Sequence, residues 1–347
     1  MIVASFRPAV GRSLLAVLVL FLGTACSPLS QTSIQAADPA SCLHRLEVPA
    51  RVSGLFVEPD DGHDPVVDEF TAAACTIDVS VYILSDDVII ESLTRAAARG
   101  VRVRVMLEKF PFGGGGGQVE VKQHLERHGV QVRWSASDIR FSHAKYAVID
   151  RQVALIMNLN LTASAFTSNR EFGVTTTDPI GVDQAQEIFD RDWRHDPLDD
   201  PAGPLLASPT NSRERLLDLI GGASQTIDFY AEVIRDAEIV AALGEAESRG
   251  VEVRLIVEAS MDEGTQELAA TLDGAGGEIR LAGSLYIHAK LMVIDDELAI
   301  VGSQNFTPTS LDDNRELAIV ATDALILDRA AAIFDRDWQR ASPGASF

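Results

Sequence analysis

Short apolar runs alternate with amphipathic segments along this chain, and the same alternation occurs twice. Residues 76–84 (TIDVSVYIL) have the composition of a buried strand, and residues 87–100 (DVIIESLTRAAARG) have the apolar spacing of a helix that ends at a glycine. Residues 101–108 (VRVRVMLE) predict a second strand. The same order returns at residues 226–234, 237–250 and 251–258. The pattern predicts one βαβ unit in each half of the chain.

Further along each half, two apolar runs flank a tight polar turn. The first half has KYAVID at 145–150 and VALIMN at 153–158, and the second has KLMVID at 290–295 and LAIVGS at 298–303. Such pairs predict hairpin strands. Together with the βαβ units, they predict an α/β fold in which each half is a mixed β-sheet flanked by helices.

Identical residues place the two halves in register. At a constant offset of 145, the match runs from His143 to Asn169-Arg170-Glu171 and on to Phe189–Trp193, which correspond to His288, residues 314–316 and residues 334–338. Upstream of these residues the offset is 150, so the first half has five extra residues, in an interval that contains glycines 113–117. We interpret the chain as a tandem duplication of two units of about 140 residues each, related by a pseudo-two-fold axis.

The junction between the units is rich in proline. Residues 196–211 (DPLDDPAGPLLASPTN) contain four prolines, which favour a connecting segment over a helix or strand. We place the boundary near residue 204, so that the first unit comprises residues 47–203 and the second comprises residues 204–347.

The first 46 residues have the pattern of an export signal followed by a tether. Arg7 and Arg12 precede the apolar stretch 14–22, and Gly23-Thr24-Ala25-Cys26 follows it. Two interpretations remain open for the signal 1–25: simple cleavage after Ala25, or a lipoprotein whose Cys26 is acylated. Residues 26–46 are rich in Ser, Gln, Ala and Pro and predict a tether. Both interpretations predict an exported protein, and the second predicts a lipoprotein of the bacterial periplasm or cell envelope.

Cys42 and Cys75 are the other two cysteines. An even pair in an exported chain favours a disulfide, and the alternative is two buried thiols.

The formal net charge is −22, and it becomes −24 without residues 1–25, which contain two arginines and no acidic residue. Such a charge repels long polyanions, which argues against extended nucleic-acid binding. It leaves room for a small basic pocket.

Polar residues recur inside the apolar hairpin strands, where each needs a partner. Histidine can attack or exchange a proton near neutral pH, while lysine and asparagine can bind a phosphoryl group and stabilise charge on its oxygens. A glutamate lies 28 residues after each histidine and could hold the second ring nitrogen. The candidate site residues in the two units are His143, Lys145, Asp150, Asn160, Glu171, His288, Lys290, Asp295, Ser303, Asn305 and Glu316.

The second unit matches H-x-K-x4-D-x6-G-S-x-N, which resembles the signature of the phospholipase D superfamily. The first unit keeps its histidine, lysine, aspartate and asparagine, but Met157-Asn158 replaces Gly-Ser. The resemblance implies a metal- and cofactor-independent phosphodiesterase with a covalent phosphohistidine intermediate, and a monomer with its site between the two repeats. It further implies that His143 attacks phosphorus and His288 protonates the leaving alcohol. Asp150 and Asp295, at strand ends, are interpreted as positioning residues.

The motifs themselves specify only a phosphodiester. We expect hydrolysis of phospholipid head groups, or their transfer to an alcohol, by an enzyme that a lipid on Cys26 would keep beside the membrane. The alternatives are an endonuclease, a cardiolipin-synthase-like phosphatidyltransferase and a catalytically inactive binding lipoprotein.

Overall fold

The computed structural model describes residues 42, 52–113, 117–200 and 203–344. The predicted signal at 1–25, Cys26 and all of the predicted tether except Cys42 lie outside the described residues. The described residues form one compact unit that contains both repeats.

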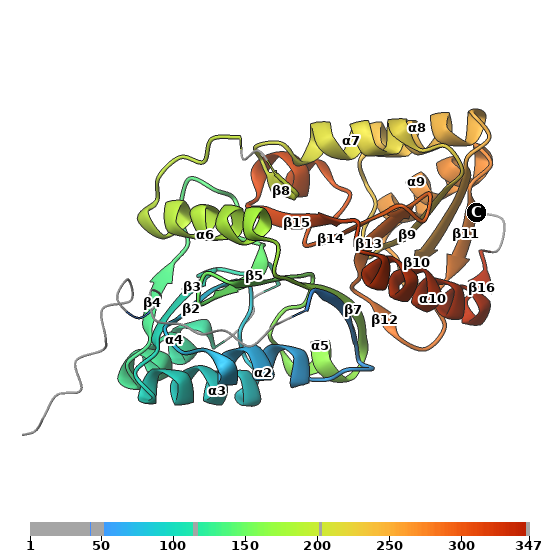
Figure 1. Ribbon diagram of the computed structural model, residues 1–347. Helices are drawn as coiled ribbons and strands as arrows, with labels where there is room; N and C mark the ends of the chain where they lie inside the picture. Colours follow the sequence, from blue (N-terminus) through green and yellow to red (C-terminus); the bar gives the residue numbers. More distant parts are fainter. Residues whose placement is uncertain (1–41, 43–51, 114–116, 201–202, 345–347) are drawn as a thin grey trace, which may run out of the picture. The chain divides into compact units, whose positions relative to one another are not determined.

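The first repeat forms a mixed sheet with helices on both faces (Figure 1). Its strands lie in the order β1-β7-β6-β5-β2-β3-β4, with parallel pairing of β2 with β3 and β3 with β4. In chain order the elements are β1 (Gly54–Glu58), α2 (Asp64–Ala72), β2 (Thr76–Val81), α3 (Asp87–Ala98), β3 (Arg102–Leu107), α4 (Gln118–Arg127), β4 (Gln131–Trp134), β5 (Lys145–Ile149), β6 (Val153–Met157), α5 (Ala163–Thr167), β7 (Asn169–Thr176) and α6 (Pro179–Arg194).

The second repeat has the same topology. Its strands lie in the order β8-β15-β14-β13-β9-β10-β11, with β16 added at the edge, while β12 crosses to the first sheet and pairs with β7. In chain order the elements are β8 (Leu205–Ser208), α7 (Ser212–Gly222), β9 (Thr226–Ala231), α8 (Ala237–Ser248), β10 (Glu252–Val257), α9 (Glu263–Gly274), β11 (Glu278–Leu281), β12 (Tyr286–Ile287), β13 (Lys290–Ile294), β14 (Leu298–Gly302), the π-helical turn η1 (Thr309–Asp313), β15 (Glu316–Ala321), α10 (Ala324–Arg340) and β16 (Ser342–Pro343).

The predicted fold class is confirmed: the chain is a duplicated α/β protein with two mixed sheets. The predicted helix at 87–100 is α3, whose first turn is capped by Asp86, and its counterpart is α8, capped by Asp236. The predicted strand at 76–84 ends earlier, at Val81, and the chain leaves the sheet at Tyr82. The predicted boundary near residue 204 lies in the connection between α6 and β8.

The two repeats share one hydrophobic core. Tyr146 and Phe172 of the first repeat pack in the same buried cluster as Tyr230 and Phe334 of the second, together with residues of α6 and α10. Each repeat also has a separate core under its own outer helices. Burial of aromatic side chains from both repeats in one cluster is a large contribution to the stability of the pair.

Two buried ion pairs cross between the repeats. Arg170 donates to Asp337 at 2.7 Å, and Arg315 donates to Asp192 at 3.0 Å. Each arginine belongs to an Asn-Arg-Glu segment, and each aspartate belongs to a Phe-Asp-Arg-Asp-Trp segment of the other repeat. The second pair is almost completely enclosed, with side chains 6% and 5% exposed. The repeated sequence segments are therefore complementary partners across the pseudo-two-fold axis.

The remaining cysteines form a disulfide: Cys42 and Cys75 are bonded, with their Cα atoms 5.7 Å apart. Among the helices of the described residues, none is long and apolar enough to span a bilayer.

Candidate active site

The backbone of each histidine segment contacts the opposite repeat. His143 precedes β5, and its backbone amide donates to the carbonyl of Arg315 at 2.8 Å. His288 precedes β13 and directly follows β12, which pairs with Asn169 and Arg170 at the start of β7. Each histidine is therefore placed by backbone contacts with the Asn-Arg-Glu segment of the other repeat.

Each imidazole is held by a glutamate from the other repeat. Nδ1 of His143 donates to Glu316 at 2.8 Å, and Nδ1 of His288 donates to Glu171 at 2.7 Å. The sequence suggested a partner 28 residues downstream in the same unit, so the pairing expected from spacing is corrected to a crosswise one. The physical reason is that β7 and β15 carry their glutamates toward the histidine segment that pairs with them from the opposite repeat.

Further side chains fix the glutamates. Asn314 donates its amide to Glu316 at 3.0 Å, and Asn169 donates to Glu171 at 3.1 Å. Ser310 also donates to Glu316, at 2.7 Å. Sequence reasoning did not assign these roles, although the repeated Asn-Arg-Glu segment was a signal for the two asparagines. Ser310 corresponds to Ala165 in the first repeat, so the duplication gave no signal for it.

The electrostatics of His143 suit a nucleophile. Burial lowers the pKa of His143 to about 4, against the opposing charge of Glu316, so the ring is neutral at pH 7. Burial raises the pKa of Glu316, but its interactions with His143 and Lys145 outweigh burial, and the net pKa is lowered. A carboxylate only accepts hydrogen bonds, so the ring proton lies on Nδ1 and Nε2 keeps its lone pair.

The two lysines are oriented in the same way. Lys145 donates to the carbonyl of His143, and Lys290 donates to the carbonyl of His288, both at 2.7 Å. Burial lowers the pKa of Lys145 to about 7, and the charge of Lys290 adds to this effect. Two such cations in one buried site are suited to binding an anionic phosphoryl group.

Asn158 replaces Ser303 without loss of the local backbone contact. The hydroxyl of Ser303 accepts from the amide of Leu317 at 3.0 Å, and Oδ1 of Asn158 accepts from the equivalent amide of Phe172 at 2.8 Å. Its Nδ2 is buried and has no hydrogen-bond partner in the described structure. Asn158 therefore keeps an unpartnered donor among the described residues, whereas the hydroxyl of Ser303 donates to the carbonyl of Leu317 at 3.4 Å.

Met157 stands where the second repeat has Gly302, and the partner residues on the neighbouring strand also differ: the ring of Phe56 fills the space beside Gly173. Gly302 pairs with Ala318, and a Cβ added to it would lie 2.2 Å from the Cβ of that alanine. Met157 pairs with Gly173, and its side chain packs in the outer core of the first repeat. The second repeat thus pairs a glycine with an alanine, and the first repeat pairs a methionine with a glycine.

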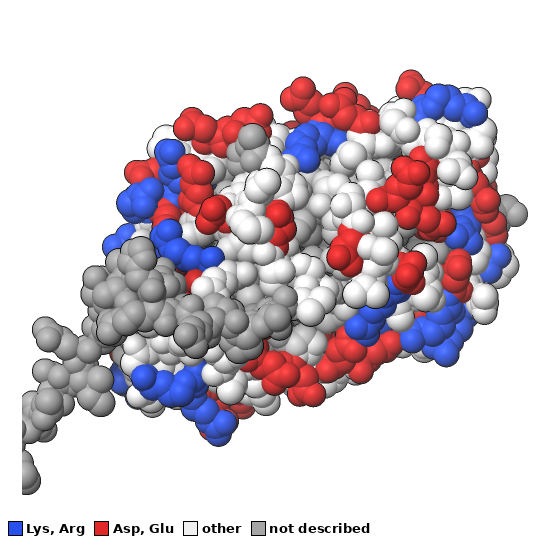
Figure 2. All heavy atoms as spheres, viewed as in Figure 1, with Lys and Arg blue, Asp and Glu red and all other residues white. Residues whose placement is uncertain are grey.

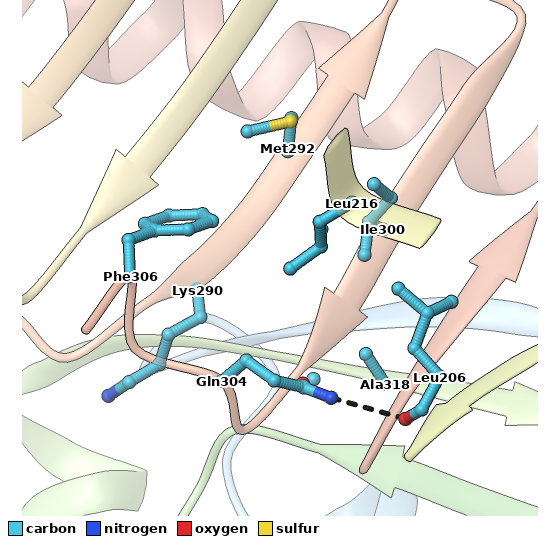
Figure 3. A pocket seen from close by; sticks show the side chains of 9 residues that line it. Leu206, Leu216, Lys290, Met292, Ile300, Gln304, Phe306 and Ala318 are labelled. Atoms are coloured by element: carbon cyan, nitrogen blue, oxygen red, sulfur yellow. Dashed lines mark hydrogen bonds between the residues drawn. The ribbon is translucent and has the colours of Figure 1, made fainter. Parts of the chain in front are cut away.

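The region around Gly302 is a small cavity under β13 and β14, lined by Met292, Ile300 and the stem of Lys290. Its free volume is about 10 Å³, enough for about one water molecule. Figure 3 shows Met292 and Phe306 lining it, while the stem of Lys290 runs past and its ammonium points away. The first motif therefore departs from the second in the packing of the strand that carries Met157 or Gly302.

The asparagines of the motifs remain available to a substrate. Oδ1 of Asn160 and Oδ1 of Asn305 are buried and have no hydrogen-bond partner in the described structure. Each asparagine follows the end of a hairpin strand that carries the motif, and its Nδ2, not its Oδ1, is the group that can donate to a phosphate oxygen beside the histidine.

The motif aspartates lie outside this site and hold the backbone, as expected of the positioning residues that their place at strand ends predicted, and they are not catalytic residues. Asp150 accepts from the backbone amides of residues 74–76, and Asp295 accepts from those of residues 224–226. Both follow the hairpin strands at the end opposite the histidines, and both have positive φ, 53° and 56°. They brace the tight turns and the start of β2 or β9.

Two further residues at equivalent positions contact the site. The ring of Tyr82 packs edge-on against His143, with centroids 4.6 Å apart. At an offset of 150, Glu232 accepts from Lys290 at 2.5 Å. Sequence reasoning missed both, because they occupy matching positions but share no residue type. Among the described residues, no group of acidic, histidine and cysteine side chains could hold a metal ion.

These pKa values predict the pH dependence of turnover. The nucleophilic role that the sequence motif implies for His143 requires a neutral ring, so kcat/KM should rise with pH through about 4. Binding requires charged Lys145, so kcat/KM should fall through about 7. Initial rates at low substrate concentration measure both limbs. An alkaline limb in the ordinary range of lysine would contradict the assignment to Lys145.

The chain belongs to the phospholipase D-like family: the family model "Cardiolipin synthase, PLD-like domain" matches residues 66–193 and 216–338. Cardiolipin synthase A of Pseudomonas entomophila is 25% identical over 330 residues, covering 83% of this chain and 68% of that protein. Mitochondrial cardiolipin hydrolase of Xenopus laevis is 29% identical over 161 residues, covering 46% and 75%. Family membership supports an enzyme that acts on phosphodiesters.

Two solved structures share the fold. The polyphosphate kinase of Porphyromonas gingivalis aligns with a TM-score of 0.71 at 18% identity, over 88% of this chain and 51% of that one. The phosphatidylserine synthase of Haemophilus influenzae aligns with a TM-score of 0.65 at 10% identity, over 84% and 87%.

Proposed function

We propose that this protein cleaves phospholipid head groups through a phosphohistidine intermediate, with water or an alcohol as the second acceptor. The observation that carries the proposal is the pair of imidazoles, each held at Nδ1 by a buried glutamate of the other repeat. This arrangement leaves both Nε2 atoms for chemistry, with a lysine beside each. A neutral histidine and an acid histidine on one phosphoryl group supply the nucleophile and the proton donor for in-line displacement.

The first half-reaction balances without a cofactor. Nε2 of His143 attacks phosphorus, the P–O bond to the head-group alcohol breaks, and its electron pair takes a proton from His288. Water or another alcohol then attacks phosphorus and gives its proton to His288, while the P–N bond breaks and its electron pair returns to Nε2 of His143. The lysines stabilise charge on the phosphoryl oxygens during both steps.

An exposed aromatic segment next to His143 supports a lipid substrate. Phe110 and Phe112 are 72% and 85% exposed, and the amide of Phe112 donates to the hydroxyl of Tyr82 at 2.5 Å. Glu108 joins the same segment to the motif, because it accepts from the amides of Phe110 and Ser142. Exposed phenylalanines beside a phosphodiester site suit an acyl-chain surface. The names of the relatives, cardiolipin synthase and cardiolipin hydrolase, support the same class of substrate.

The surface charge does not favour a nuclease. The chain carries a formal charge of −22, and Figure 2 shows acidic side chains spread over the viewed face, with basic ones in separate small groups. A nucleic-acid site would require a basic track for successive phosphates.

Transfer to a lipid acceptor is the second candidate. It is favoured by the similarity to cardiolipin synthase A over 83% of this chain. The two reactions share the phosphohistidine and differ in the acceptor, water or a second lipid alcohol.

We also propose that the protein is exported and held at the bacterial cell envelope by a lipid on Cys26. The support is the order of arginines, apolar stretch and small residues before Cys26. Such an anchor would raise the effective concentration of enzyme at a lipid surface.

The test of function is head-group release with transfer. The full chain is incubated with vesicles of phosphatidylcholine, phosphatidylethanolamine and phosphatidylglycerol in the presence of a primary alcohol. We expect free head group and the phosphatidyl-alcohol, measured by mass spectrometry, because an alcohol competes with water for the phosphohistidine. His143→Asn is the matched control and should form neither product.

Other results would assign another function. Cardiolipin formed from phosphatidylglycerol in excess of hydrolysis would favour the transferase. Cleavage of DNA without lipid turnover would indicate a nuclease, and lack of activity on both would indicate a binding protein.

A further inference from the structure

The two halves of the active site differ at one position that contacts the machinery. Tyr82 follows β2 and Glu232 follows β9, at equivalent places in the two repeats. Tyr82 places a neutral ring against His143 and lies 5.4 Å, ring centroid to Nζ, from Lys145. Glu232 places a carboxylate beside the other histidine and lysine. The two halves of the site therefore differ in charge at this equivalent position.

The carboxylate of Glu232 is closely surrounded. Oε2 lies 2.5 Å from Nζ of Lys290 and 3.5 Å from Nε2 of His288, while Oε1 accepts from the hydroxyl of Tyr286 at 3.2 Å. The side chain is 18% exposed. Burial raises the pKa of Glu232, but the charges of His288 and Lys290 outweigh it and lower the net pKa far below the ordinary value. Glu232 is therefore ionised at neutral pH.

This contact gives the two histidines different surroundings. His288 has Glu171 on Nδ1 at 2.7 Å and Glu232 near Nε2, so carboxylate oxygens face both ring nitrogens. His143 has Glu316 on Nδ1 and the ring of Tyr82 beside it. Lys290 and Tyr286 both donate to Glu232, and the charges of His143 and Lys145 also act on this carboxylate. A carboxylate near Nε2 stabilises a proton on that nitrogen.

We propose that Glu232 is a positioning residue that keeps the proton on Nε2 of His288, and so assigns proton donation to His288 and nucleophilic attack to His143. This inference rests on the proposed phosphohistidine mechanism and adds to it the reason for the direction of the reaction. In the first half-reaction, the proton on Nε2 of His288 passes to the leaving oxygen as the P–O bond breaks. Glu232 itself forms and breaks no covalent bond.

The test compares leaving groups that differ in their need for a proton. p-Nitrophenoxide is a good leaving group and needs no proton, whereas an alkoxide must be protonated as it leaves. Loss of the acid therefore slows only the alkyl ester. Phosphatidyl-p-nitrophenol and phosphatidylethanol share the same phosphatidyl group. In Glu232→Gln we expect a loss of about 30-fold or more with phosphatidylethanol and of less than about 3-fold with phosphatidyl-p-nitrophenol. The ratio of the two rates within one preparation does not depend on the folded fraction.

Two control variants separate this role from others. Glu263→Gln removes an exposed carboxylate in the first turn of α9 and should leave both rates unchanged. Tyr82→Phe, at the equivalent position in the first repeat, removes a hydroxyl without a charge and should change both rates by the same factor. A second readout is the site of the trapped phosphohistidine, which acid-free denaturation and mass spectrometry should locate on His143 in the wild type.

The outcomes are distinct. Equal losses on both esters in Glu232→Gln, or a trapped phosphoryl group on His288 in the wild type, would overturn the role of Glu232. Turnover of bis(p-nitrophenyl) phosphate without turnover of any lipid ester would refute only the lipid substrate, and the trapped histidine would then decide the inference. Failure to turn over any of these esters would overturn the proposed mechanism and this inference together.

Discussion

Replacing either histidine should reduce turnover by about 10³-fold or more, and replacing both should reduce it little further. His143→Asn removes the nucleophile, and His288→Asn removes the proton donor to the leaving alcohol. Residues that act in one mechanism are not additive, so the double variant should resemble the more severe single variant. Single-turnover rates with phosphatidylethanol measure all three variants.

The two single variants should also differ from each other. Only His288→Asn keeps a nucleophile, so it should still release p-nitrophenol from phosphatidyl-p-nitrophenol and accumulate the phosphohistidine. Near-normal turnover in His143→Asn would show that the first motif is not catalytic and that the nucleophile assignment is wrong.

Removing one arginine of the crosswise ion pairs should destabilise the chain strongly. Arg315→Ala leaves the buried carboxylate of Asp192 without its cation and also frees the carbonyl of Ser208 that Arg315 binds. Loss of one partner of a buried pair costs about 3–5 kcal/mol of the free energy of unfolding. Urea unfolding followed by circular dichroism measures the change.

The control is an exposed pair in the same chain. Arg95 pairs with Glu91 on the surface of α3, with side chains 70% and 60% exposed, so Arg95→Ala should cost less than about 0.5 kcal/mol. Equal effects of the two arginine variants would contradict the view that the enclosed pairs hold the repeats together.

The elements and the duplication could be predicted because they depend on local pattern. Apolar runs and helical spacing located β2, α3, β3 and the hairpins, and identical residues at fixed offsets placed the repeats in register. The histidines and lysines followed from the same identities. The sequence could not show whether a repeated residue pairs with its partner in the same repeat or in the other repeat.

Pairing across a symmetry axis is invisible to sequence spacing. Each glutamate follows the histidine of its own repeat by the same 28 residues, and only the strand geometry places it beside the histidine of the opposite repeat. Glu232 was missed for the opposite reason. It breaks the repeat, and a search for matching residues passes over the position where two copies have come to differ.

The covalent joining of the repeats has a consequence for how this chemistry can evolve. In an assembly of two identical subunits, every substitution appears on both sides of the axis, so the two histidines stay chemically equivalent and either can begin the reaction. Fusion into one polypeptide lets each half mutate alone. The tyrosine at position 82 and the glutamate at position 232 are such a divergence, available only to a chain that encodes both halves separately.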